Sequence, residues 1–188
     1  MNSKKKRQDW QESLAIGKQG VADISKFLES KIVKQTWFDT YLVHNVEDEE
    51  RYQDCDIDLL WVVPVQTFLQ CRTIEVKTDR NRHTGNFFFE TVSVEHRGRP
   101  GAFVITRAEW FFYYFITAGE LYCFSTAELK PWFLKNEHEF PERRSHSDDN
   151  QRMFSWSTVG KIVPIERVMT EISHKKVFQN TESGWKAM

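Results

Sequence analysis

The stretch Asp56-Ile57-Asp58-Leu59-Leu60-Trp61-Val62-Val63 decides how this chain folds. After Asp58 every side chain is apolar, whichever way it points, which is typical of a strand buried on both faces in a sheet covered by helices. We therefore expect a strand over residues 56–65. Asp56 and Asp58 stand two residues apart at its start, so both carboxylates project to the same side of the sheet.

Two more strands are expected downstream, over residues 67–78 and 86–94, joined by a polar connection. In the first of them Glu75 and Lys77 are two residues apart and point the same way, whereas Val76 faces the core. In the second, Glu90 ends the run Phe87-Phe88-Phe89. Charges on apolar strands are unfavourable unless they are paired or bind a cation, and a hard divalent metal held by oxygens would explain all of them. Each pair taken alone could instead belong to an exposed polar face or a turn.

The flanking segments predict helices and strands around this centre. Apolar residues at three- and four-residue steps indicate an amphipathic helix over 10–31, in which Gly17 and Gly20 mark a close approach or a break. Thr106-Arg107-Ala108-Glu109 has the form of a capping box and predicts a helix over 107–118, ended by Gly119. The remaining expectations are an extended segment over 34–43, a strand over 121–124, a helix from Ser125, a surface loop over 136–152, an extended segment over 154–164 and a helix from Pro164.

This order of elements predicts a mixed α/β fold, in which helices flank a single mixed β-sheet. With 188 residues the chain is long enough for one domain, which we place at residues 10–178, between a basic flexible tail over 1–9 and a loosely held C-terminal tail over 179–188. Fifteen Phe, seven Trp and five Tyr exclude a disordered or low-complexity chain. They are expected mainly in the core or at a subunit contact.

Charge and cysteine content narrow the class of protein further. The net charge of −1 argues against a non-specific polycation, although acidic residues gather over 47–58 and arginines over 80–107. Three scattered cysteines without a CxxC pair fit a reducing compartment better than a disulfide framework or a zinc site. No secretory signal or membrane-length apolar run is present. We expect a cytoplasmic protein of a bacterium or phage-infected cell, with no membrane partner.

Asp58, followed by Glu75-Val76-Lys77, resembles the D…(D/E)-x-K signature of the PD-(D/E)xK nuclease superfamily. The resemblance covers about residues 14–130 and extends to strings typical of small phage and bacterial members, which are Ile74-Glu75-Val76-Lys77-Thr78-Asp79, Thr84-Gly85-Asn86, Phe88-Phe89-Glu90, Gly101 and Thr106-Arg107-Ala108-Glu109-Trp110. It implies a restriction-endonuclease-like core. One position departs from the pattern: Val21 stands where many members carry a first-helix Glu, and Gln19 or Asp23 could substitute for it.

The resemblance implies metal-dependent hydrolysis of DNA phosphodiester bonds, with Asp58, Glu75 and Lys77 as catalytic residues. Asp58, Glu75 and the Val76 carbonyl would hold Mg²⁺, for which Mn²⁺ can substitute, with Asp56 as a reserve ligand. Lys77 would orient the attacking water or stabilise charge on the phosphoryl oxygens. Glu90 would either hold a second ion or an outer-sphere water, or form a structural salt bridge.

DNA is the expected partner, and a homodimer is possible. The candidate DNA-contacting residues flank the proposed site and are Arg80, Arg82, His83, Arg97 and Arg99. Arginines in such loops can equally be simply solvated. The segment 136–152 is a candidate specificity loop.

Other functions fit the sequence less well than the metal-dependent nuclease. The main alternative is a catalytically inactive nuclease-like fold that binds nucleic acid or protein. A metal nuclease built on His83 or His96 with Asn86 has the wrong local sequence context. The chain has no G-x-S-x-G nucleophile elbow and no Gly-rich phosphate loop.

Overall fold

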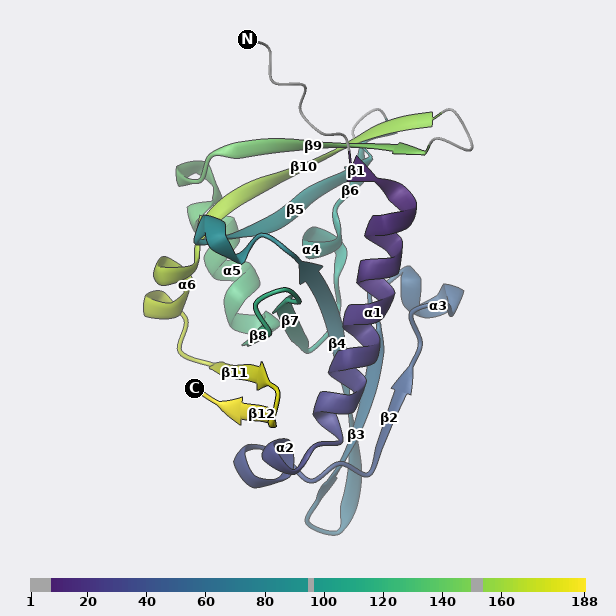
Figure 1. Cartoon of the computed structure of the whole chain (residues 1–188), viewed down its shortest axis with the longest axis vertical. Helices are drawn as coiled ribbons and strands as arrows, with labels where there is room; N and C mark the ends of the chain where they lie inside the picture. The colour runs from purple at the N-terminus through teal and green to yellow at the C-terminus, as the bar shows by residue number, and fades with distance from the viewer. Residues whose placement is uncertain (1–7, 95–96, 150–153) are drawn as a thin grey trace.

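Strand β7 (Trp110–Phe115) lies at the centre of the molecule, with five of its six residues buried. The structure is a computed structural model that describes residues 8–94, 97–149 and 154–188. Within these residues the strands form two sheets, and helices pack against them (Figure 1). The large curled mixed sheet flanked by helices confirms the expected mixed α/β class. A second sheet was not anticipated.

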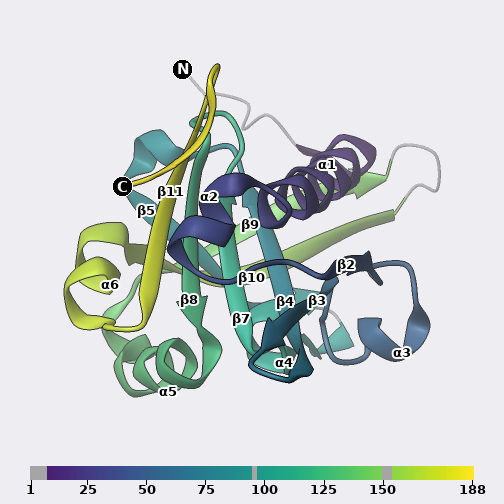
Figure 2. The same ribbon diagram turned by 90° about the horizontal axis from the view of Figure 1, so that it is seen from below.

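The larger sheet contains seven strands among the described residues. Only β4 and β7 pair in parallel, and the other neighbours are antiparallel. Figure 2 shows β11, β8, β7, β4 and β3 side by side. In spatial order the strands are β12 (Gly184–Ala187), β11 (Lys175–Thr181), β8 (Glu120–Ser125), β7, β4 (Phe68–Asp79), β3 (Leu59–Val65) and β2 (Leu42–Asn45).

The smaller sheet contains five strands in the same described residues, and it crosses one end of the large sheet (Figure 1). Its long antiparallel strands β9, β10 and β5 dominate it. In spatial order the strands are β1 (Gln8–Asp9), β9 (Glu142–Asp149), β10 (Phe154–Pro164), β5 (Asn86–Val94) and β6 (Arg99–Pro100).

Helix α1 crosses the large sheet and packs along β4. Its buried side chains recur on one face, as the amphipathic pattern predicts. No helix of the described residues is long and apolar enough to cross a membrane. The helices are α1 (Trp10–Leu28), α2 (Lys31–Thr36), α3 (Glu50–Gln53), α4 (Ala102–Ile105), α5 (Thr126–Asn136) and α6 (Ile165–Glu171), with 3-10 turns at Arg82–Thr84 and Glu137–Glu139.

The two faces of β7 belong to two separate aromatic cores. Phe112 and Tyr114 pack towards α1 with residues such as Phe27, whereas Phe111 and Tyr113 pack towards the smaller sheet. Strand side chains alternate between faces, so a strand between two cores must be apolar at nearly every position. This arrangement accounts for much of the aromatic surplus.

The helix expected over residues 107–118 is wrong, because residues 110–115 form β7. The hydroxyl of Thr106 does accept a hydrogen bond from the Ala108 N–H (3.1 Å), as a capping residue can, but the chain continues as a strand and not as a helix. Gly119, with φ of +69°, instead lies in the turn between β7 and β8. A helix over this run would have exposed some of its rings, whereas a central strand buries almost all of them.

Three further segments differ from expectation. The loop expected over 136–152 contains a 3-10 turn and β9, which pairs with β10. The extended segment expected over 34–43 begins with the last residues of α2. Residues 179–188, expected as a loose tail, contribute to the β11–β12 hairpin, where the Trp185 ring lies 4.8 Å from that of Phe27. Residues 1–7 of the expected basic tail lie outside the described residues.

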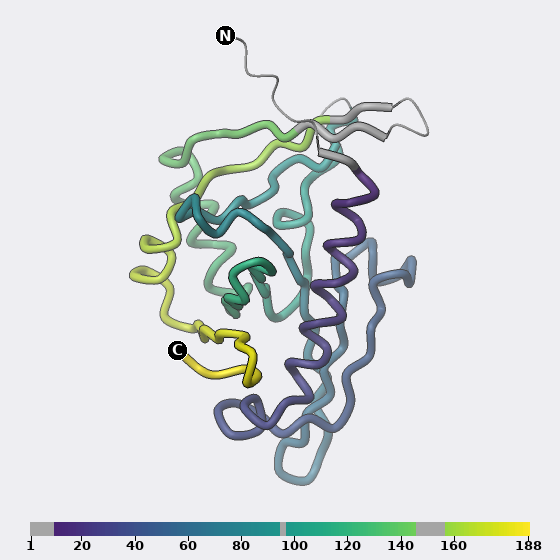
Figure 3. Tube along the Cα trace, viewed as in Figure 1, coloured from purple at the N-terminus to yellow at the C-terminus, as the bar shows by residue number. Residues whose placement is uncertain are grey.

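The central expectations hold. Strands β3, β4 and β5 coincide closely with the three expected strands, and α1 with the expected first helix. The turn between β3 and β4 projects beyond the helices (Figure 3), which leaves Phe68 and Leu69 exposed. Gly20 does mark a close approach, since a Cβ atom there would lie 1.8 Å from the Thr78 hydroxyl oxygen. Helix α1 therefore lies directly on the strand that carries Glu75 and Lys77.

Candidate functional site

Asp58 lies where β3 stops pairing with β4. The last paired residues of the two strands are Leu59 and Ile74. The main-chain N–H of Val76, two residues further along β4, therefore has no partner on β3. The Val76 N–H donates instead to Asp58 Oδ2 at 2.8 Å, while the Asp58 N–H donates to the Ile74 carbonyl at 2.9 Å. These bonds fix the Asp58 carboxylate beside the centre of β4.

Asp56 lies in a turn that is held in place by hydrogen bonds from Thr106 and Arg107. Its φ of +52° is a conformation that Asp tolerates better than most residues. The Thr106 hydroxyl donates to the Asp56 carbonyl (2.9 Å), and the Arg107 N–H donates to the Cys55 carbonyl (2.8 Å). Among the described residues, the buried Asp56 Oδ2 has no hydrogen-bond partner. One carboxylate oxygen is therefore left for a ligand or a proton.

Glu75 is the buried centre of this acidic group, with 6% of its surface exposed. Burial, followed by the charges of Asp58 and Asp56, raises the pKa of Glu75 well above its ordinary range. Burial likewise raises the pKa of Asp58 to about 6 and that of Asp56 above its usual value. Three carboxyl groups from two segments thus lie close enough to disfavour one another's charge.

Lys77 reaches across from β4 towards the smaller sheet. Its Nζ lies 3.4 Å from Glu90 Oε2, with 28% of the lysine side chain and 13% of the glutamate side chain exposed. Burial lowers the pKa of Lys77, but the carboxylates of Glu90 and Glu75 outweigh burial and hold that pKa above its ordinary value. The ammonium group is therefore charged and held in place.

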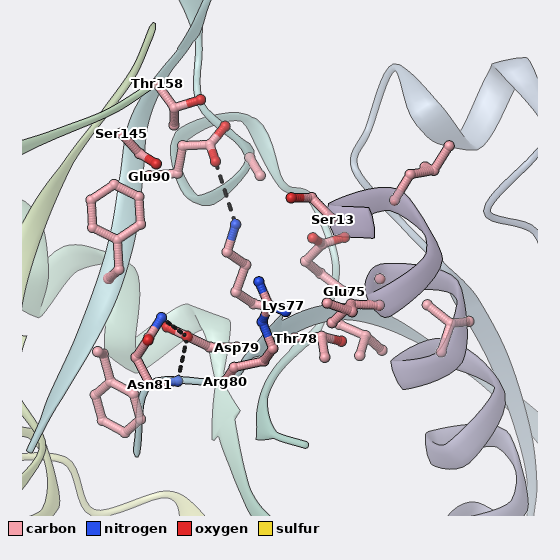
Figure 4. Close-up of a pocket in the computed structure, with 18 of the residues that line it drawn as sticks. Ser13, Glu75, Lys77, Thr78, Asp79, Arg80, Asn81, Glu90, Ser145 and Thr158 are labelled. Atoms are coloured by element: carbon pink, nitrogen blue, oxygen red, sulfur yellow. Dashed lines mark hydrogen bonds and ion pairs between the residues drawn. The ribbon is translucent and has the colours of Figure 1, made fainter. Parts of the chain in front are cut away.

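These groups open into one cavity of about 440 Å³ between α1 and the smaller sheet. Figure 4 shows Ser13 and Glu75 on the side beside α1, and Glu90, Ser145 and Thr158 on the opposite side, with Lys77 extending between them. Asp58, Glu75 and Lys77, the catalytic candidates that the sequence singles out, line this cavity together with Val76. Asp56 is absent from the lining, and its carboxyl group bonds to that of Glu75.

The predicted DNA-contacting residues are spread over a wider surface. Arg80 lines the cavity and pairs with Glu12 of α1. Arg82 pairs with Glu120 and does not line the cavity. His83, Arg97 and Arg99 are exposed outside it. His96, weighed above as a metal ligand, lies outside the described residues.

Four charged residues that line the cavity were not among the predicted site residues: Lys18, Glu47, Asp79 and Arg143. Glu47 lies in the segment between β2 and α3 and lines the cavity. Burial is the main cause of the raised pKa of Asp58, and the charge of Glu47 raises that pKa a little more. Arg143 enters from β9. The acidity of residues 47–58 was a signal for Glu47, but nothing local to Arg143 marks it as a site residue, because the pairing of β9 with β10 brings it there.

The α1 wall supplies no carboxylate to the cavity. Val21 packs in the core with 3% of its surface exposed. Gln19 and Asp23, the expected substitutes for a first-helix Glu, bond to each other at 2.7 Å and do not line the cavity. Glu12 pairs with Arg80 instead.

A metal ion here would depend on more than side chains. No group of three or more His, Cys, Asp or Glu side chains in the described ranges is arranged to hold a metal ion by itself. Mg²⁺, however, commonly uses one or two carboxylates and keeps several waters. Asp58, Glu75 and a main-chain oxygen fit that requirement, and a cation would relieve the mutual repulsion of the buried carboxylates.

Comparison with known proteins gives one distant similarity. No family model and no curated protein matches the chain. A solved structure of a nuclease from a fusselovirus aligns over 86% of this chain and 90% of its own, with 11% sequence identity and a TM-score of 0.36.

Proposed function

We propose that this protein is a metal-dependent nuclease that hydrolyses DNA phosphodiester bonds. The observation that carries the proposal is the convergence of Asp58, Glu75 and Lys77 on one cavity, although 17 residues separate the two carboxylates along the chain. Buried carboxylates beside an ammonium group are costly to maintain without a ligand. Hydrolysis of a phosphodiester at a divalent ion uses this combination of groups.

Asp58 and Glu75 would hold Mg²⁺, with the Val76 carbonyl as a third oxygen. When bound, the ion would polarise the phosphate and lower the pKa of a coordinated water. The Val76 N–H bond to Asp58 Oδ2 orients that carboxylate next to Glu75. Asp56 remains the reserve ligand, since its Oδ2 is buried without a partner among the described residues.

Lys77 would act on the phosphate side of the reaction. Its charged ammonium group, fixed by Glu90, can stabilise negative charge that develops on the phosphoryl oxygens or orient the attacking water. The observed contact favours the salt-bridge role for Glu90, because the carboxylate already has the ammonium as its partner. Glu90 would then be a positioning residue.

Cleavage assays test the proposal directly. The intact protein is incubated with Mg²⁺ or Mn²⁺ and linear, flapped, branched or single-stranded DNA. Glu75→Gln and Lys77→Ala should each lower the rate by about 10²–10³-fold or more, as is usual when a group that stabilises transition-state charge is lost. The exposed Glu166 and Lys186 lie outside the cavity, so Glu166→Gln and Lys186→Ala serve as matched controls.

If the intact protein cleaves none of these DNA substrates with either metal, the enzyme proposal is wrong. In that case the inactive nucleic-acid-binding or protein-binding fold would be favoured, in line with the lack of a carboxylate on the α1 wall. Equal loss of activity in Lys77→Ala and Lys186→Ala would also contradict it.

A further inference from the structure

The cavity has two walls of different chemistry. The wall formed by the first turns of α1 presents two large apolar side chains: Trp10 exposes 38% and Leu14 46% of its surface, and both line the cavity. Large exposed apolar side chains beside a charged site usually mark a binding surface. They are not needed to close a core, since neither belongs to the buried clusters.

The opposite wall is polar and belongs to the smaller sheet. Arg143 and Ser145 of β9 and Thr158 of β10 line it, and Ser145 pairs directly with Thr158 in the ladder. Arg143 lies in the row of Gly160 and Glu90. Arg143 is exposed, and among the described residues no carboxylate forms an ion pair with its guanidinium. It is therefore available to an anion.

The remaining cations of the cavity are already paired. Lys18 pairs with Asp48, Lys77 with Glu90 and Arg80 with Glu12. The carboxylates that line the cavity are Glu47, Asp58, Glu75, Asp79 and Glu90. Because the three lining cations named above already have carboxylate partners, we expect contacts to bases to add to the affinity.

The volume and the apolar wall indicate which form of DNA fits. About 440 Å³ lies within the range of ~300–1,000 Å³ typical of small-ligand sites, which is room for a nucleotide or two. A duplex presents phosphates and sugars on its outside and hides the faces of its bases. An unpaired strand exposes bases along one side and phosphates along the other, which matches the two walls.

We propose that the substrate enters as an unpaired DNA strand, with a base against Trp10 and Leu14, the scissile phosphate at Asp58, Glu75 and Lys77, and a neighbouring phosphate against Arg143, Ser145 and Thr158. This inference rests on the proposed nuclease function and specifies its substrate class. The aromatic residues of β7 cannot play the part of Trp10, because they are enclosed between the two cores.

Binding assays separate this inference from catalysis. Fluorescence anisotropy of the full chain with Ca²⁺ replacing Mg²⁺ compares a labelled 12-nucleotide single strand with a blunt duplex of the same sequence. The single strand should bind at least about tenfold more tightly. Trp10→Ala should weaken single-strand binding by about 5- to 150-fold, which corresponds to one base–aromatic stacking contact. Leu14→Ala should weaken it by a smaller factor, through loss of apolar contact with the base. Trp10→Phe should restore much of the loss.

Leu134 provides a matched control, since it is exposed to a similar extent (54%) on α5 and does not line the cavity. Leu134→Ala should bind both DNAs like the wild type, and thermal melting checks that each variant folds. Arg143→Gln should weaken binding and reduce the slope of log K against log salt by about 0.7, the value expected for one lost single-strand phosphate contact.

Equal affinity for strand and duplex, or Leu14→Ala behaving like Leu134→Ala, would overturn the inference. Cleavage of duplex as fast as single strand would overturn it while leaving the nuclease proposal intact. Strand-selective binding that depends on Trp10 and Leu14, without cleavage in any metal, would support the binding surface and refute the nuclease.

Discussion

The ammonium group of Lys77 lies 3.4 Å from the carboxylate of Glu90, which joins β4 of the large sheet to β5 of the smaller one at the cavity. Burial alone would lower the pKa of Lys77, and the neighbouring carboxylates reverse that effect. The charge state of the lysine therefore depends on a residue from a different sheet.

Replacing Glu90 with Gln should lower the pKa of Lys77, because the burial of the ammonium group is then less fully offset. We expect the alkaline limb of the pH–rate profile of DNA cleavage to move to lower pH. The Mg²⁺ concentration for half-maximal activity should change by less than about twofold, since a positioning residue contributes no metal bond. A rise of about tenfold or more in that concentration would show instead that Glu90 binds metal directly or through an outer-sphere contact.

The acidic group predicts an unusual pH dependence of stability in the metal-free protein. In the folded state Asp58 holds its proton up to a pH of about 6, whereas in the unfolded chain it releases the proton near 4. Between these pH values the folded state therefore binds more protons than the unfolded chain. The contribution of Asp58 to the free energy of unfolding is complete below pH 4 and is lost as the pH rises through 6.

Asp58→Asn isolates this effect, since Asn retains an oxygen that can accept the Val76 N–H bond. Relative to wild type, the variant should gain about 1–2 kcal/mol of unfolding free energy between pH 5 and pH 8, measured by urea titration with EDTA. Mg²⁺ at about 100 times its dissociation constant should add about 2.7 kcal/mol to the wild type at pH 8 and far less to the variant. A pH-independent difference between the two proteins would contradict the raised pKa.

The contact between Gly20 and Thr78 predicts opposite effects for two alanine substitutions in α1. A Cβ atom at Gly20 would overlap the Thr78 hydroxyl, whereas one at Gly17 would have no atom within 4 Å. Gly20→Ala should therefore cost about 1–3 kcal/mol through overpacking. Gly17→Ala should stabilise by about 0.5–1 kcal/mol through helix propensity. Similar unfolding free energies for the two variants would show that α1 does not lie this close to β4.

Tyr113 links the two sheets through its hydroxyl group. It donates to Asp79 Oδ2 at 2.7 Å and accepts a bond from the Phe88 N–H at 3.1 Å. Tyr113→Phe leaves both partners without this bond in a buried place and should cost about 1–3 kcal/mol. For a chain of this size that corresponds to a fall in Tm of about 2–4 °C for each kcal/mol.

Tyr41 is the matched control, because 68% of its surface is exposed. Tyr41→Phe should change Tm by less than about 1 °C, within the small effect usual for surface substitutions. If both variants melt at the wild-type temperature, the hydroxyl bridge contributes nothing to stability.

Sequence reasoning located β3, β4 and β5 because their signal is local: runs of β-branched and aromatic residues, bounded by polar turns. It misassigned residues 107–118 because a capping-box pattern beside an aromatic run reads equally well as the start of a helix. Burial on both faces made residues 110–115 a strand, and that burial exists only once α1 and the smaller sheet are in place.

The sequence by itself determined the mixed α/β class, and the period of two along a strand put Glu75 and Lys77 on one face. The grouping of Asp58 with these two residues came from the resemblance to a nuclease signature. Only the tertiary structure decided the walls of the cavity. Trp10, Glu47 and Arg143 come from a helix, a loop and a strand far apart along the chain. Their meeting depends on how the two sheets pack, which no local pattern encodes.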